Sequence, residues 1–247
     1  MNKEVKVQEF GIIVAIEENK PSVMNADFLK YSGIVPESWE LARQPIFTQS
    51  LTQVVYTNGV SIIAEPNRVI FVESLEGKEV KDITVAAIAE RYVKMLPNAK
   101  YQGLGANPRG YVGFEGADAD AGRKFISERL FAPGAWQQAG KEPMRSTVNL
   151  VYSYDRAPLY LTINEAALRN PDESTTPIVL FSGSFSYEVS GESSEEKLNN
   201  LLKVMGNWQT DLQEFCYLIN HKFLGVSQET ASIVPDVFTV NSVAAAV

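Results

Sequence analysis

The C-terminal part of the chain carries, at residues 193–225, the sequence SSEEKLNNLLKVMGNWQTDLQEFCYLINHKFLG. Its apolar residues recur in alternating steps of three and four, a spacing that keeps them in one stripe along a helix. The stripe consists of Leu198, Leu201, Met205, Trp208, Leu212, Phe215 and Ile219. Ser193 and Glu196 have the spacing of a capping box at its start. We therefore predict one long helix over these residues.

This helix would be roughly 45 Å long at 1.5 Å per residue, whereas a strand of average length spans ~20 Å. We expect part of the stripe to project beyond the sheet of its own chain and to contact a protein partner. The apolar tail that follows, residues 226–247, contains Phe238 and Val240, which we expect to join that contact or to add a strand to a neighbouring sheet. The alternative is that the stripe simply crosses the back of its own sheet.

Strand patterns fill most of the remaining chain. We predict strands at residues 5–18, a three-stranded meander within 51–74, and strands at 100–105, 111–114, 147–154, 159–164 and 178–189, with shorter helices at 82–96 and 118–130. Asn58-Gly59 is interpreted as a two-residue turn that sets Val55 opposite Ile62, and residues 106–110 as a second turn. The fold class is α+β: antiparallel sheet or sheets, two shorter helices and one long C-terminal helix.

An order of three strands followed by a helix occurs twice along the chain. This order is compatible with an internal duplication, with pseudo-repeats at about residues 44–115 and 116–225 followed by the tail 226–247. Because 247 residues can form one core, we expect a single domain over residues 1–247.

Composition excludes several classes of partner. The chain has 22 Lys and Arg against 30 Asp and Glu, a net charge of −8, and it lacks a basic run. Nucleic acid and anionic membrane are therefore not expected partners, because both need clustered positive charge. The single cysteine excludes an internal disulfide framework, and no stretch approaches the ~20 apolar residues that span a bilayer. We expect a cytoplasmic protein.

The sequence offers few residues for catalysis. His221 is the only histidine and stands five positions after Cys216, the only cysteine, so the two side chains point to different faces of the predicted helix. One histidine also excludes the usual zinc and non-haem iron sites, and we expect no cofactor.

Two weak candidate sites remain. Arg109, in the predicted turn at 106–110, would bind a carboxylate or phosphate if Tyr101 and Tyr111 framed it. Asp118 and Asp120 have the spacing of two metal-binding carboxylates, although acids at this place also suit the start of a helix, which is the interpretation we favour.

We therefore expect a non-enzymatic assembly subunit, in a homo-oligomer or a larger complex, that works through its long helix and tail. The alternatives are a small-ligand-binding protein or metal-dependent enzyme that uses Asp118, Asp120 and Arg109, and a sensor or inhibitor in a conflict between host and mobile element.

Overall fold

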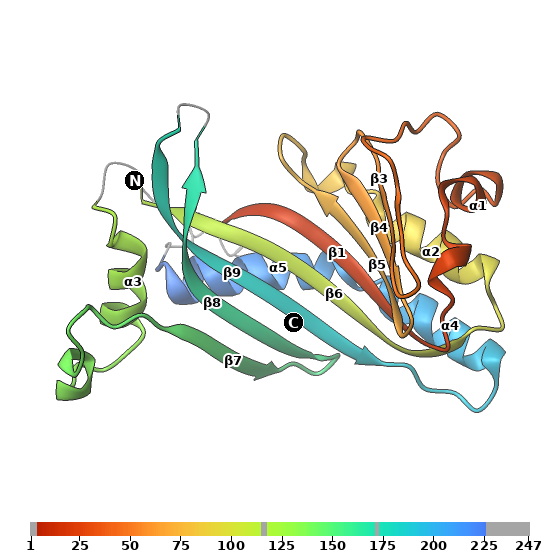
Figure 1. The fold of residues 1–247 in the computed structure, drawn as a ribbon. Helices are drawn as coiled ribbons and strands as arrows, with labels where there is room; N and C mark the ends of the chain where they lie inside the picture. Colours follow the sequence, from red (N-terminus) through yellow and green to blue (C-terminus); the bar gives the residue numbers. More distant parts are fainter. Residues whose placement is uncertain (1–3, 115–117, 171–172, 226–247) are drawn as a thin grey trace, which may run out of the picture.

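The computed structural model of the chain describes residues 4–114, 118–170 and 173–225. It is built around a nine-stranded antiparallel sheet with the order β2-β3-β4-β5-β1-β6-β9-β8-β7 (Figure 1). The strands are β1 Lys6–Glu17, β2 Ile46–Phe47, β3 Thr52–Val55, β4 Val60–Glu65, β5 Arg68–Ser74, β6 Lys100–Gly113, β7 Thr147–Ser153, β8 Pro158–Arg169 and β9 Thr175–Glu188. The predicted α+β class is confirmed.

The three predicted helices occur in the predicted order, and a short helix, α1, which was not predicted, precedes them. The helices are α1 Ala26–Tyr31, α2 Val85–Met95, α3 Ala121–Arg129, α4 Ser194–Met205, α5 Trp208–Tyr217 and the π-helical turn η4 Leu218–Phe223, with short 3-10 turns that include η2 Val80–Asp82. Within the described residues no helix is long and apolar enough to cross a membrane.

The long C-terminal helix is present as α4, α5 and η4 in succession, with a break only at Gly206 and Asn207. Its start has the predicted capping box: the side chain of Ser193 accepts a hydrogen bond from the backbone N–H of Glu196, and the Glu196 carboxylate accepts one from the backbone N–H of Ser193. In Figure 1 the blue helices α4 and α5 run behind the sheet along β6 and β9.

The stripe on this helix is covered by the chain itself. Its exposed fractions are 0% for Leu201, Phe215 and Ile219, 1% for Leu212 and 3% for Met205, while Leu198 and Trp208 pack on the same core. The expectation that the stripe projects beyond the sheet is therefore wrong, and the alternative that it crosses its own sheet is correct. The cause is strand length: β1, β6 and β9 have 12, 14 and 14 residues, so they extend about 40 to 46 Å at ~3.3 Å per residue.

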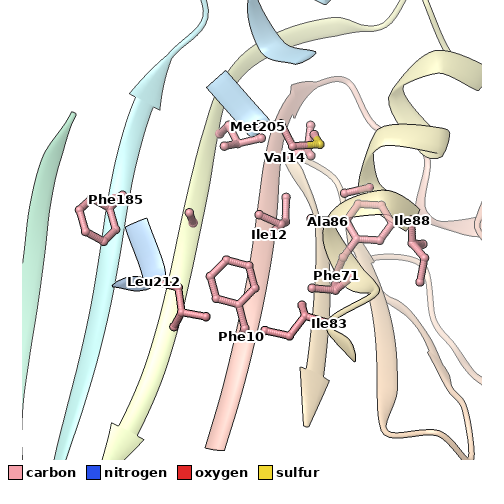
Figure 2. Close-up of a cluster of buried hydrophobic side chains, with 14 of the residues drawn as sticks. Phe10, Ile12, Val14, Phe71, Ile83, Ala86, Ile88, Phe185, Met205 and Leu212 are labelled. Atoms are coloured by element: carbon pink, nitrogen blue, oxygen red, sulfur yellow. The ribbon is translucent and has the colours of Figure 1, made fainter. Parts of the chain in front are cut away.

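One core lies between the sheet and its helices. Figure 2 shows Phe10, Ile12 and Val14 of β1 pointing toward the same layer as Met205 and Leu212 from the long helix. Side chains of α2, α5 and both halves of the sheet belong to a single buried cluster. Period-2 alternation along β1 decides this arrangement, because every second residue faces the helices.

The register of the first hairpin differs from the prediction. Val54 pairs with Ile62 and Val55 with Ser61, rather than Val55 with Ile62. The loop has three residues instead of two, since the backbone N–H of Tyr56 donates to the carbonyl of Val60 at 2.8 Å. Gly59 ends this loop at φ 87°, the left-handed conformation that a three-residue hairpin loop requires at its last position.

The predicted turn at residues 106–110 is wrong, because β6 runs unbroken from Lys100 to Gly113. Pro108 lies within it, opposite Phe10 of β1. On the β9 side the pairs Ala106–Phe185 and Arg109–Ser182 bring Gly183 opposite Pro108. A Cβ on Gly183 would stand 3.2 Å from Pro108 Cγ, so the glycine provides the room that the proline ring needs.

The strand order is similar on the two sides of the central strands β1 and β6. β1 is followed outward by β5, β4 and β3, and β6 is followed by β9, β8 and β7. This order is compatible with the predicted duplication, which stays a prediction. Equivalent units would begin at β1 and β6 rather than at residues 44 and 116.

Candidate interaction surface

The sheet has a second face, opposite the helices, which we call the open face. Because successive residues of a strand point to opposite sides, its side chains are the neighbours of the core residues. It comprises Glu9, Gly11 and Ile13 of β1, Ile70 and Val72 of β5, Arg109 of β6, Ser182 and Ser184 of β9, Tyr160 and Thr162 of β8, and Asn149 and Val151 of β7. None of these side chains belongs to the buried core cluster.

Arg109 lies in the middle of the open face, in a row across three strands. It pairs with Glu9 of β1 and with Ser182 of β9. Its Nε lies 3.4 Å from Ser182 Oγ, and its terminal nitrogen lies 3.8 Å from a Glu9 carboxylate oxygen. These residues, with Gly11 and Asn107, line a cavity of about 240 Å³.

Only one of the two tyrosines expected to frame Arg109 shares its face, because the alternation of β6 places Tyr111 on the open face with Arg109. Tyr101 points to the helix side, is 1% exposed, and donates its hydroxyl to the carbonyl of Leu96 at 2.8 Å. The nearest charge to Arg109 is the Glu9 carboxylate, which offsets the positive charge that an anion would need.

The two candidate metal ligands are each held by a cation of α3. Asp118 accepts a hydrogen bond from Lys124 Nζ at 2.5 Å, and Asp120 accepts one from Arg123 at 3.1 Å. The hydrogen bond from Arg123 lowers the pKa of Asp120. Neither aspartate lines the cavity beside Arg109. Among the described residues no group of three potential metal ligands occurs.

The outer strand β7 forms one border of the sheet. Its sequence, TVNLVYS, contains neither a charged residue nor a proline. On the open face Val151 pairs with Tyr160 of β8, and these side chains are 62% and 50% exposed. At the opposite border β2 has only two residues. Within the described parts of the chain no further strand pairs with the outer side of β7.

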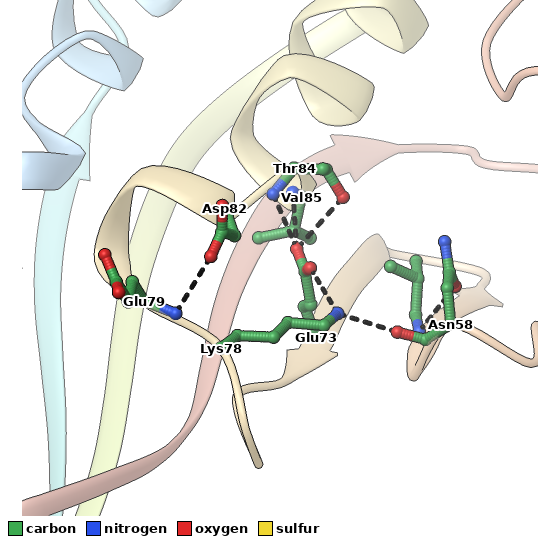
Figure 3. A network of polar contacts seen from close by, with 8 residues as sticks. Asn58, Glu73, Lys78, Glu79, Asp82, Thr84 and Val85 are labelled. Carbon is green, nitrogen blue, oxygen red and sulfur yellow. Dashed lines mark hydrogen bonds and ion pairs between the residues drawn. The ribbon is translucent and has the colours of Figure 1, made fainter.

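Two buried polar clusters, which the sequence reasoning missed, stabilise the body. Glu73 of β5 is 1% exposed and accepts hydrogen bonds from Lys78 Nζ at 2.7 Å and from the backbone N–H groups of Thr84 and Val85 at 2.7 and 2.9 Å (Figure 3). It thus supplies the acceptor that the start of α2 needs. Its signal in the sequence is an acid in phase with the core residues Val69 and Phe71.

The second cluster joins α5 to the sheet. The side chain of Asp211 is fully buried and accepts hydrogen bonds from Arg156 Nε at 2.7 Å and from the Tyr187 hydroxyl at 2.9 Å. Arg156 also binds Glu214. Burial alone would lower the pKa of Arg156, but its hydrogen bonds to the two carboxylates outweigh this effect and raise the pKa. Each charged group has a partner, so we assign the cluster a structural role.

Three further residues named in the sequence analysis are Cys216, Phe238 and Val240. Burial raises the pKa of the Cys216 thiol to about 11, which disfavours the nucleophilic thiolate. Phe238 and Val240 lie outside the described residues. No protein-family model and no curated protein matches the chain.

Proposed function

We propose that the protein is a non-enzymatic interaction subunit that binds a protein partner through β7 and the adjoining part of the open face. The observation that carries this proposal is an outer strand of seven residues without charge or proline, next to the exposed pair Val151 and Tyr160. Strands at a sheet border present free backbone N–H and C=O groups, which pair readily with a further strand.

The β2 and β7 borders of the sheet differ in their protection against further strand pairing, and this difference supports the proposal. Proteins protect sheet borders by very short strands, by charged side chains or by proline. The β2 border has the first of these protections, since it has two residues. The β7 border has none of the three. A border left in this state is typical of a strand that is paired in its working form.

The contact surface differs from the one expected from the sequence. The stripe residues Leu201, Leu212 and Phe215 belong to the core of the chain, so they do not offer a surface to a partner. The alternative of a ligand-binding protein or enzyme has less support, because Arg109 lies beside Glu9 whereas Asp118 and Asp120 bind cations of α3.

Val151→Lys tests the proposal. A lysine on a border strand weakens pairing with another strand but is tolerated in the monomer, because the side chain at this position is 62% exposed. We expect the variant to lose at least tenfold in affinity for whichever protein binds the purified wild type, measured by surface plasmon resonance. The matched control is Val80→Lys in η2, where the exposed fraction is 48%. Equal loss in both variants, or none in either, would contradict the proposal.

A further inference from the structure

We infer that the partner of β7 is β7 of a second copy of the chain, paired antiparallel about a two-fold axis at Leu150. This inference rests on the proposed function and names its partner. The axis is perpendicular to the sheet, so the two sheets would continue into each other with their open faces on the same side. Such an isologous contact is the commonest way in which identical subunits pair.

The strand itself selects the register. β7 extends from Thr147 to Ser153, and Leu150 is its middle residue. Pairing about Leu150 sets Thr147 opposite Ser153 of the second copy, Val148 opposite Tyr152, and Asn149 opposite Val151. All seven residues then pair, and each open-face residue meets another open-face residue. A centre one residue away in either direction would leave residues at both ends without partners.

Self-pairing also explains the absence of charge from β7. In a two-fold contact Leu150 faces its own copy, and Asn149 and Val151 each lie diagonally across from their own copies, so a charge at any of these positions would approach a like charge. The chain as a whole has a net charge of −8, which opposes association. A strand with no charged residue is the part of this surface where two copies approach at the lowest electrostatic cost.

The residues that flank β7 have opposite charges. Arg145 and Asp155 stand at equal distances from Leu150 along the chain, on opposite sides of it. The two-fold axis therefore brings Arg145, which precedes β7 in each copy, to the β7–β8 turn that contains Asp155 in the other copy, an arrangement that favours two ion pairs. Both side chains are available, since Arg145 is 82% exposed at its side chain and Asp155 is exposed. Arg145 also lies 3.3 Å from Glu165 of its own chain, a contact that solvent weakens.

The contact would bury apolar surface on both faces of the sheet. On the open face it covers Val151, which is 62% exposed in the single chain. On the helix face it covers Val148, Leu150 and Tyr152, which are only partly buried against the core because they stand at its border. The two Leu150 side chains meet at the axis.

Charge reversal tests the pairing. We expect the full-length wild type to form a dimer in sedimentation velocity, and Arg145→Glu or Asp155→Arg alone to raise its dissociation constant about tenfold, because each creates two like-charged pairs. An equimolar mixture of the two variants should restore the dimer, because every like-charged pair then becomes an opposite-charged one. A folding defect in either variant would not be repaired by mixing, and equal melting temperatures of the dilute monomers provide the control.

Three outcomes would overturn the inference. These are a monomeric wild type at concentrations up to the millimolar range, single variants that dimerise like the wild type, and a mixture that does not dimerise. A dimer that is lost when the chain ends at Gly225, but unaffected by charge reversal, would assign the contact to residues 226–247 instead. If Val151→Lys abolishes binding to another protein while the wild type is monomeric, the proposed function stands and this inference fails.

Discussion

Tyr56 and Tyr187 are both buried in the core, but only the hydroxyl of Tyr187 has a hydrogen-bond partner among the described residues. Tyr187 donates to both carboxylate oxygens of Asp211, at 2.9 Å each. The hydroxyl oxygen of Tyr56 is buried and has no hydrogen-bond partner among the described residues. Burial raises the pKa of both to about 12. A buried hydroxyl without a partner loses its hydrogen bonds to water and makes none in the folded protein, so its burial lowers the free energy of unfolding.

The same substitution should therefore lower the stability of the fold at Tyr187 but not at Tyr56. We expect Tyr56→Phe to leave the free energy of unfolding unchanged or to raise it by up to ~1 kcal/mol, because it removes an unsatisfied group. Tyr187→Phe should lower it by about 1 to 3 kcal/mol, because Asp211 loses one of its two donors. Urea unfolding followed by circular dichroism measures both. Destabilisation by Tyr56→Phe that equals that of Tyr187→Phe would show that Tyr56 has a partner.

Alkaline pH should act through these two groups as well as through Tyr92 and Tyr101, whose pKa burial also raises. The folded-state pKa values of Tyr56 and Tyr187, about 12, lie above the ordinary value of 10.0, so folding favours the neutral phenol. This contribution to stability is fully present below pH 10 and is lost as the pH rises from 10 towards 12. We expect the urea midpoint to fall over this range, and to fall less in Tyr56→Phe. A midpoint that is constant up to pH 12 would contradict these shifts.

At the level of elements, the position of α5 depends on a close approach to β9. Phe215 lies against Gly183, where an added Cβ would stand 2.8 Å from the phenylalanine ring. The Asp211 cluster holds the same helix by hydrogen bonds to Tyr187 of β9 and Arg156 of the β7–β8 turn. Apolar packing and a satisfied polar network thus fix one helix on the sheet.

Truncation of the helix stripe should therefore affect folding. We expect Phe215→Ala to lower the free energy of unfolding by about 3 to 5 kcal/mol, because it leaves a cavity at a fully buried site. Tyr217→Ala on the same helix, at 43% exposure, should change it by less than ~1 kcal/mol. Chemical denaturation gives both values. Stable folding of Phe215→Ala together with loss of self-association would instead return the stripe to the role of an interface.

At the scale of the whole molecule, both halves of the sheet share one core. The buried cluster includes Phe71 of β5 and Phe181 of β9, which lie on opposite sides of the central strands β1 and β6. Trp39 packs on Tyr56 in the first half, and Trp208 packs on Phe10 beneath the long helix. These two tryptophans report on different parts of one core.

We therefore expect unfolding to be cooperative across the chain. A variant that keeps only Trp39, and another that keeps only Trp208, should have fluorescence midpoints in urea that coincide with the circular-dichroism midpoint of the same variant. A second core mutation, Phe71→Ala, should shift both fluorescence midpoints equally. Separate midpoints would show that the predicted single domain is instead two units.

The sequence by itself determined the type and order of most elements. Strand alternation over 5–18 and the three-four spacing over 193–225 are local patterns, and the structure confirms β1, α2, α3 and the long helix. These predictions depend only on the spacing of apolar residues within one element, which neighbouring residues in the sequence determine. Arg109, Asp118 and Asp120 were chosen as candidate ligand-binding residues from their side-chain chemistry alone. The sequence did not show which residues lie next to them in the fold.

Tertiary structure alone decided the rest. The strand through Pro108 lies against Gly183 of β9, a residue distant in sequence whose missing side chain leaves room for the proline ring. The hairpin register depends on a third loop residue. Whether the helix stripe would be covered depended on the lengths of β1, β6 and β9 side by side, a property of the assembled sheet. Burial results from contacts between residues far apart in the chain. The apolar pattern of one segment does not show which other segment will cover it.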